Sequence, residues 1–133
     1  MPKFLSAVLV SLIVTVACIV VFAQGPSPQG NNEPPSLGVA PKEANGIGRA
    51  DVRVFDESGN PIKNAYVKLE STRSDGFFCE SWGGTNDHGM IALPPIHMGN
   101  LKLKVKAKGY RSQELEVPTS QLGDPIRVTL KKK

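Results

Sequence analysis

The stretch FFCESW gathers the side chains of this 133-residue chain that are best suited to binding a ligand. In an extended chain, alternate side chains point to opposite faces, so Phe78, Glu80 and Trp82 share one face, and Phe77 and Cys79 share the other. Both faces cannot easily be core in a two-layer fold, so we expect one aromatic set to be partly exposed.

An exposed Trp82 beside Glu80, with Tyr66 nearby, would form a stacking platform for sugar rings or an anchor for a protein partner. The sequence therefore places its candidate site for a protein partner or a sugar at Tyr66, Phe78, Glu80 and Trp82. The alternative is structural, because Trp82 could instead fold over an open end of the protein and take no part in binding.

Cys79 is the one cysteine left in the chain if the N-terminal apolar segment, which carries Cys18, is removed on export. We expect a buried free thiol, and the alternative is an intermolecular disulfide that links two copies of the chain through Cys79. The sequence places no histidine near this thiol, which therefore lacks the base that a nucleophile needs. No catalytic residue is predicted.

A second pattern with chemical potential is the run LKLKVKAKGY, which places a lysine at every second position from Lys102 to Lys108. Such a row could hold an anion, but the solvated face of a strand looks the same. If the run turns at Gly109 and pairs with the next strand, Glu114 and Glu116 stand opposite the lysines and halve the local field. No aromatic side chain interleaves with the lysines to stack on bases. We therefore expect a solvated strand face and no nucleic-acid partner, and the net charge of +4 is too mild to change this.

The elements that must position these residues fall into three parts of the chain. Residues 1–23 combine one positive charge with an uncharged apolar run, which predicts a signal peptide or, if it is not cleaved, an N-terminal membrane anchor. Residues 24–45 are rich in proline and glycine and show no apolar period, so we expect a flexible linker. Residues 46–133 should form the folded domain. The protein is thus expected to be secreted, or to reside in the periplasm or cell envelope.

After residue 46, short runs of alternating apolar and polar residues are separated by turn residues. This texture is typical of half-buried antiparallel strands, and no helical period is present. The spacing predicts an all-β, seven-stranded antiparallel sandwich. The segments expected to form strands are RADVRVF, AYVKLE, GFFCESW, IALP, LKLKVKA, ELEV and IRVTL.

Three motifs, VRVFDESGNPIKNAYVKL, TNDHGMIAL and LPPIHMGNLKLKVKAKGY, follow one another in the order found in a known family. From Gly48 to Leu130 the chain resembles the carboxypeptidase regulatory-like domain, a transthyretin-like or prealbumin-like sandwich related to the B-type repeats of collagen adhesins. The resemblance implies a Greek-key strand order but no particular activity. Two positions depart from the family pattern, because Ile91 and Leu101 stand where an aromatic residue is usual.

The turn residues in these motifs have physical roles. Asp56 can cap its own turn, Gly59 can adopt a positive φ, and Pro61 starts the next extended segment. Asn86 and Gly89 repeat the device before a later strand.

Two enzyme classes use related sandwiches. Hydroxyisourate hydrolases end in a tyrosine-arginine-glycine-serine signature, which GYRS at residues 109–112 echoes only superficially because it lies in an internal hairpin. Intradiol dioxygenases bind iron through two tyrosines and two histidines. This domain contains Tyr66, Tyr110, His88 and His97, but no close spacing that would build a preformed site, so no metal is predicted.

Together these patterns predict an exported, non-catalytic β-sandwich module for protein binding or structural support at the cell envelope. A carbohydrate-binding module that uses the exposed aromatic residues is one alternative, and a small transthyretin-like hydrolase is another. The expected partner is a protein or a polysaccharide, with no cofactor and no nucleic acid. A membrane contact is expected only through an uncleaved N-terminal segment.

Overall fold

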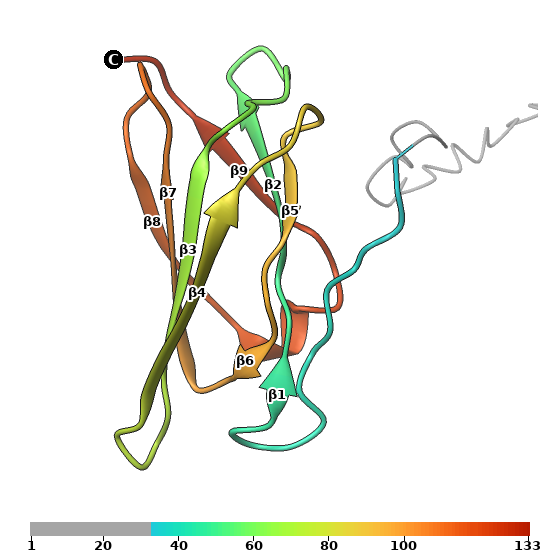
Figure 1. Ribbon diagram of the computed structural model, residues 1–133, viewed down its shortest axis with the longest axis vertical. Coiled ribbons are helices and arrows are strands. Elements are labelled where there is room, and N and C mark those ends of the chain that lie inside the picture. The colour runs from blue at the N-terminus through green and yellow to red at the C-terminus, as the bar shows by residue number, and fades with distance from the viewer. Residues whose placement is uncertain (1–32) are drawn as a thin grey trace, which may run out of the picture. The chain divides into compact units, whose positions relative to one another are not determined.

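The computed structural model describes residues 33–133, which form an all-β fold (Figure 1). The strands are joined by turns, loops and one short 3₁₀ helix, η1 (Thr119–Gln121). The strands are β1 (Ile47–Gly48), β2 (Asp51–Asp56), β3 (Tyr66–Thr72), β4 (Phe78–Gly84), β5 (Met90–Ala92), β6 (Ile96–His97), β7 (Asn100–Lys106), β8 (Gln113–Val117) and β9 (Ile126–Leu130).

The predicted signal peptide or anchor, residues 1–23, lies outside the described residues, as does the first part of the predicted linker. Within residues 33–133, no helix is long and apolar enough to cross a bilayer. Export and membrane anchoring therefore stay predictions.

Two sheets face each other across one hydrophobic core. The larger sheet has four antiparallel strands in the order β4-β3-β7-β8, and the smaller has three in the order β5-β2-β9. The short strands β1 and β6 pair separately. Buried side chains from both larger sheets, such as Val54 of β2 and Leu103 of β7, belong to the same core cluster. This two-layer arrangement is consistent with the predicted sandwich.

In the four-stranded sheet, alternate side chains point into the core. Val67 and Leu69 on β3, and Leu103 and Val105 on β7, point into the core and are fully buried. Burial of each such side chain stabilises the fold by about 1.5–3 kcal/mol. The side chains between them point to solvent, so this sheet presents an outward face of charged and aromatic residues.

Each of the seven segments expected to form strands overlaps an observed strand. The structure adds β1 and β6, so the described residues contain nine strands and not seven. Each added strand has two residues, which is too short for an alternating pattern to be visible in the sequence.

One strand pair differs from the expected antiparallel arrangement, which was wrong for this pair. β2 and β9 run parallel, with Val54 opposite Val128. A parallel pair requires a long crossover connection, and here all strands from β3 to β8 lie between β2 and β9 along the chain. The alternating pattern of IRVTL identifies the buried side chains but not the direction of the strand, so the sequence did not reveal this pairing.

The two predicted turn devices are present. The Asp56 carboxylate accepts hydrogen bonds from the N–H groups of Ser58 and Asn60, both at 2.9 Å, and Gly59 has a φ of +83°. These backbone hydrogen bonds lower the pKa of Asp56, that from Asn60 most strongly. Asn86 accepts two N–H hydrogen bonds in the same way in the turn before β5.

The compact unit begins at Pro34, well before the boundary at residue 46 that the sequence suggested. Residues 34–45 therefore belong to the fold and not to a flexible linker. The first part of this segment, residues 34–39, is called the N-terminal arm below. Hydrogen bonds to polar groups hold the arm in place, and its Leu37 side chain remains exposed, so an apolar period is not needed to attach it.

A buried ion pair lies under the arm. Arg53 and Asp51 on β2, which are 1% and 2% exposed, approach each other to 3.3 Å. The Arg53 guanidinium also donates to the Pro34 carbonyl at 2.8 Å, and the Leu37 N–H donates to the Asp51 carboxylate at 2.9 Å. The arm therefore supplies hydrogen bonds to charges that would be costly to bury without them.

Candidate binding face on the four-stranded sheet

The four residues predicted for the site share one surface, the outward face of the four-stranded sheet. The edge strand β4 contributes Phe78, Glu80 and Trp82, which alternate with inward-pointing residues. Tyr66 lies on the neighbouring strand β3, two residues before Lys68, which stands opposite Trp82. Tyr66 and Trp82 are therefore diagonal neighbours on this face.

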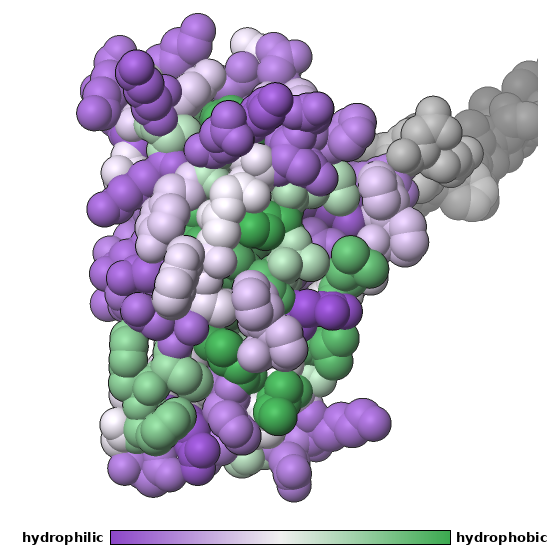
Figure 2. Space-filling model, in the orientation of Figure 1, coloured by the Kyte–Doolittle hydropathy of each residue, from purple (hydrophilic) through white to green (hydrophobic). Residues whose placement is uncertain are grey.

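The aromatic side chains of this face are open to solvent. Trp82 is 56% exposed, Phe78 51% and Tyr66 42%, and these three residues are called the aromatic strip below. In Figure 2 a group of hydrophobic side chains stands at the lower left, over the hairpin end of β4, among hydrophilic ones. Trp82 stands opposite Lys68 within the sheet and is exposed, so it lies on the flat face and does not fold over an open end of the sandwich.

Phe77 is exposed as well, although the alternation placed it on the opposite side from Phe78. It belongs to the turn before β4, where the Phe77 N–H donates to the Asp75 carboxylate at 3.1 Å. Its ring lies 5.4 Å from the guanidinium carbon of Arg73, within the range of a cation–π contact. Both phenylalanines of FFCESW are therefore available at this end of the sheet.

Ion pairs occupy the middle of the face. Lys68 lies 2.9 Å from Glu70 and 3.6 Å from Glu80, and Lys104 of β7 reaches Glu70 at 3.2 Å. Hydrogen bonds from Lys68 and Lys104 lower the pKa of the Glu70 carboxyl below its ordinary value of 4.5. The hydrogen bond to Glu70 raises the pKa of Lys68 above 10.5. These opposite charges largely neutralise one another.

The predicted pairing of the lysine row with acidic residues is confirmed. β7 and β8 form a hairpin, with Gly109 at a φ of +85° in the turn. Lys102 stands opposite Glu116 and Lys104 opposite Glu114, while the Glu114 carboxylate lies 3.3 Å from the Lys102 ammonium. Exposed pairs of this kind contribute about 0–1 kcal/mol, so their main effect is on register and on the net charge of the face.

Cys79 is a free thiol on the inward side of β4, and it is partly exposed where full burial was expected. Its Sγ donates a hydrogen bond to the His97 carbonyl oxygen at 3.2 Å. The structure thus brings a histidine to Cys79 that the sequence spacing did not reveal. The thiol contacts the His97 backbone, however, while the His97 ring nitrogen Nδ1 lies 3.2 Å from the Asn45 carbonyl oxygen.

The two tyrosines and two histidines weighed as iron ligands do not converge. Tyr66 lies on the outward face of β3 and His88 in the turn before β5. His97 precedes β7 and Tyr110 follows it, so they lie beyond opposite ends of a strand about 20 Å long. Within residues 33–133, no group of three His, Cys, Asp or Glu side chains is placed to hold a metal ion.

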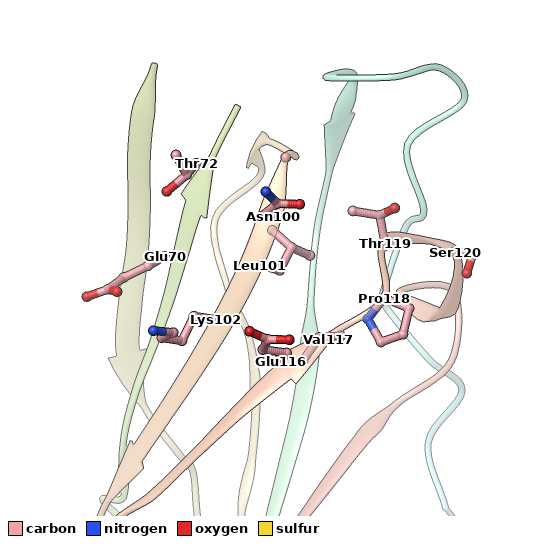
Figure 3. A pocket seen from close by; sticks show the side chains of 11 residues that line it. Glu70, Thr72, Asn100, Leu101, Lys102, Glu116, Val117, Pro118, Thr119 and Ser120 are labelled. Carbon is pink, nitrogen blue, oxygen red and sulfur yellow. The ribbon is translucent and has the colours of Figure 1, made fainter. Parts of the chain in front are cut away.

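A groove of about 910 Å³ lies at the β8 end of the outward face, where β8 stops at Val117. The sequence did not predict it. Alternation along β3 and β7 could have indicated its Thr72 and Asn100, but the part formed by η1 depends on how the chain turns after β8. Figure 3 places Asn100 and Thr119 on opposite sides of the opening, with Lys102 and Glu116 farther along the strands. The lining residues are Glu70, Thr72, Gly99, Asn100, Leu101, Lys102, Glu116, Val117, Pro118, Thr119 and Ser120.

No family model and no curated protein matches this chain. Among solved structures, 19 chains are similar to it. One is the 3-chlorocatechol 1,2-dioxygenase from Rhodococcus opacus 1CP, with a TM-score of 0.53, 12% sequence identity and coverage of 74% of this chain. The chain spans 65% of the length of that dioxygenase chain. At this identity the similarity shows the fold alone, and it says nothing of activity.

Proposed function

We propose that this chain is an exported, non-catalytic β-sandwich module that binds a protein or polysaccharide partner at the cell envelope or outside the cell. The observation that carries the proposal is the exposure of Trp82 and Phe78 on β4, an edge strand of the four-stranded sheet. Aromatic side chains supply a large contact area and are enriched among the residues that dominate binding energy. The aromatic strip is therefore the proposed contact surface.

We further propose that the domain is a carboxypeptidase regulatory-like, transthyretin-like sandwich with a Greek-key strand order. The two facing sheets, the β7–β8 hairpin and the turns at Asp56 and Asn86 support this assignment. Such a fold offers rigid strands on which exposed side chains keep fixed positions. It would present the aromatic strip as a preformed surface.

A binding assay on the chain without residues 1–23 tests the proposed function. The immobilised chain is exposed separately to the extracellular proteins of the producing organism and to a panel of cell-envelope and plant polysaccharides. Trp82→Ala and Phe78→Ala are each expected to weaken binding of the true partner about tenfold, or about 1.4 kcal/mol. Ile47→Ala is the matched control, because it removes an exposed apolar side chain that lies on β1, outside the strip.

Partner binding that the two strip variants weaken and Ile47→Ala leaves unchanged would support the proposal. Binding that is the same for all three variants would move the contact surface elsewhere and contradict it. The thermal midpoint of each variant shows whether it is folded.

A further inference from the structure

We propose that the groove at the β8 end of the outward face binds an uncharged oligosaccharide, so that the partner of the module is a neutral polysaccharide. This assignment rests on the binding function proposed above and adds a ligand class and a second set of residues. Phe78 stands opposite Thr72, and Thr72 stands opposite Asn100. One row of outward side chains thus leads from the aromatic strip into the groove.

The groove exists because β8 ends before β7 does. Pairing of the two strands stops at Leu101 and Val117, and Pro118, which has no N–H to continue the ladder, turns the chain into η1. Asn100 of β7 therefore has no opposite residue on β8. The space that this leaves is the groove, with Thr119 across the opening from Asn100 (Figure 3).

Close packing at Gly99 fixes one wall of the groove. The Gly99 N–H donates to the Ser71 hydroxyl at 2.8 Å, and a Cβ at this position would collide with the Thr72 carbonyl. The start of β7 is therefore held tightly against β3. A wall that is already rigid loses little conformational entropy when a ligand binds.

Unpartnered polar groups line the groove. Hydroxyl and amide side chains both donate and accept hydrogen bonds, and a carboxylate accepts them. A saccharide is complementary to such a set, because each of its hydroxyl groups can also donate and accept. Five lining side chains have no hydrogen-bond or ion-pair partner within residues 33–133: Thr72, Asn100, Glu116, Thr119 and Ser120.

The charges of the groove argue against an anionic ligand. The lysine of the groove, Lys102, lies 3.3 Å from Glu114. One of its two carboxylates, Glu70, lies 3.2 Å from Lys104. Among the described lining residues no unpaired cation remains for a phosphate or sulfate group. The remaining carboxylate, Glu116, falls far short of the six or more oxygens that Ca²⁺ requires.

The apolar part of the groove argues against a peptide. Leu101 and Val117 are only 4% and 8% exposed, so neither side chain forms an apolar pocket that a peptide side chain could fill. The volume of about 910 Å³ lies near the upper end of the range of about 300–1,000 Å³ for small-ligand sites, which suits several sugar rings better than one. Phe78 lies about 10 Å from the Asn100 strand, two strand spacings away, where it could stack on a further ring.

Isothermal titration calorimetry with hexasaccharides of stated composition tests the assignment. The neutral probes are fragments of cellulose, xylan, mannan and chitin, and the charged probe is a polygalacturonate fragment. We expect at least one neutral probe to bind and the charged probe not to bind. Asn100→Ala and Glu116→Gln should each weaken the neutral probe about tenfold, because each removes hydrogen bonds to the sugar. Thr129→Ala, an exposed threonine on β9 of the other sheet, is the matched control.

The outcomes separate the groove from the proposed function. Trp82→Ala could abolish sugar binding while Asn100→Ala and Glu116→Gln leave it unchanged. This result would overturn the groove assignment but not the binding function. A protein that binds through the strip, with none of the sugars binding, would overturn the saccharide assignment alone. Absence of both kinds of binding would overturn both. A melting temperature for every variant identifies any that fails to fold, and Thr119→Ala then replaces it.

Discussion

Glu70 holds together the charged residues of the outward face. It accepts hydrogen bonds from Lys68 on its own strand and from Lys104 on β7, a residue 34 positions away in the chain. Alternation along β3 and β7 places each of these side chains on the outward face. The contact between Glu70 and Lys104 could not be predicted, because it requires knowing that β3 and β7 are neighbours in the sheet.

Replacing Glu70 by glutamine is predicted to reduce the decrease in the free energy of unfolding as the pH falls. Lys68 and Lys104 lower the pKa of folded Glu70 below 4.5, the ordinary value that the unfolded chain approaches. A carboxyl group of this kind stabilises the fold above its unfolded pKa, and the contribution disappears as pH falls through the folded pKa. Between about pH 6 and pH 3 the wild-type protein should therefore lose more stability than Glu70→Gln.

Urea denaturation at several pH values measures this difference. Glu116→Gln is the matched control, because it removes a carboxylate of the same face that has no ion-pair partner within residues 33–133. Parallel pH profiles for the wild type and Glu70→Gln would show that the ion pairs of Glu70 do not persist in solution.

At the scale of elements, the N-terminal arm allows β2 to bury two charged side chains. Asp51 and Arg53 alternate with the core residues Val52 and Val54 on β2, at positions where a half-buried strand usually exposes its side chains to water. The structure buries both under the arm. A segment rich in proline and without apolar period therefore becomes part of the fold through hydrogen bonds to a buried ion pair.

Replacing Arg53 by alanine is predicted to lower the free energy of unfolding by about 3–5 kcal/mol, because Asp51 would stay buried without its cation. Arg111→Ala, at an exposed arginine, should change it by no more than about 0.5 kcal/mol. Chemical denaturation measures both values. Amide hydrogen exchange adds an independent check, since the Leu37 N–H bonded to Asp51 should be protected. If Arg53→Ala is as stable as Arg111→Ala and the Leu37 amide exchanges fast, this account is wrong and the arm is a flexible linker.

The sequence predicted those elements whose side chains alternate over several residues. All seven expected strands are present, as are the turns at Asp56 and Asn86 and the β7–β8 hairpin. It did not predict the direction of β9, because alternation carries no information on strand direction. It also missed the groove, since this depends on where β8 stops at Pro118 relative to the longer β7.

At the scale of the whole domain, the two sheets differ in what they leave open. The arm covers Asp51 and Arg53 on the outward side of the three-stranded sheet, whereas Phe78 and Trp82 on the four-stranded sheet remain exposed. The aromatic strip and the groove both belong to this second sheet. The four-stranded sheet is therefore the surface on which a long ligand could lie across several strands.

A nuclear magnetic resonance titration of the isotope-labelled domain with an uncharged hexasaccharide tests this account most directly. Binding on the four-stranded sheet predicts shifts of the Thr72, Asn100 and Thr119 amide signals and of the Trp82 indole signal, with the signals of β9 unchanged. Shifts confined to the three-stranded sheet, or no shift at saturating sugar, would contradict it.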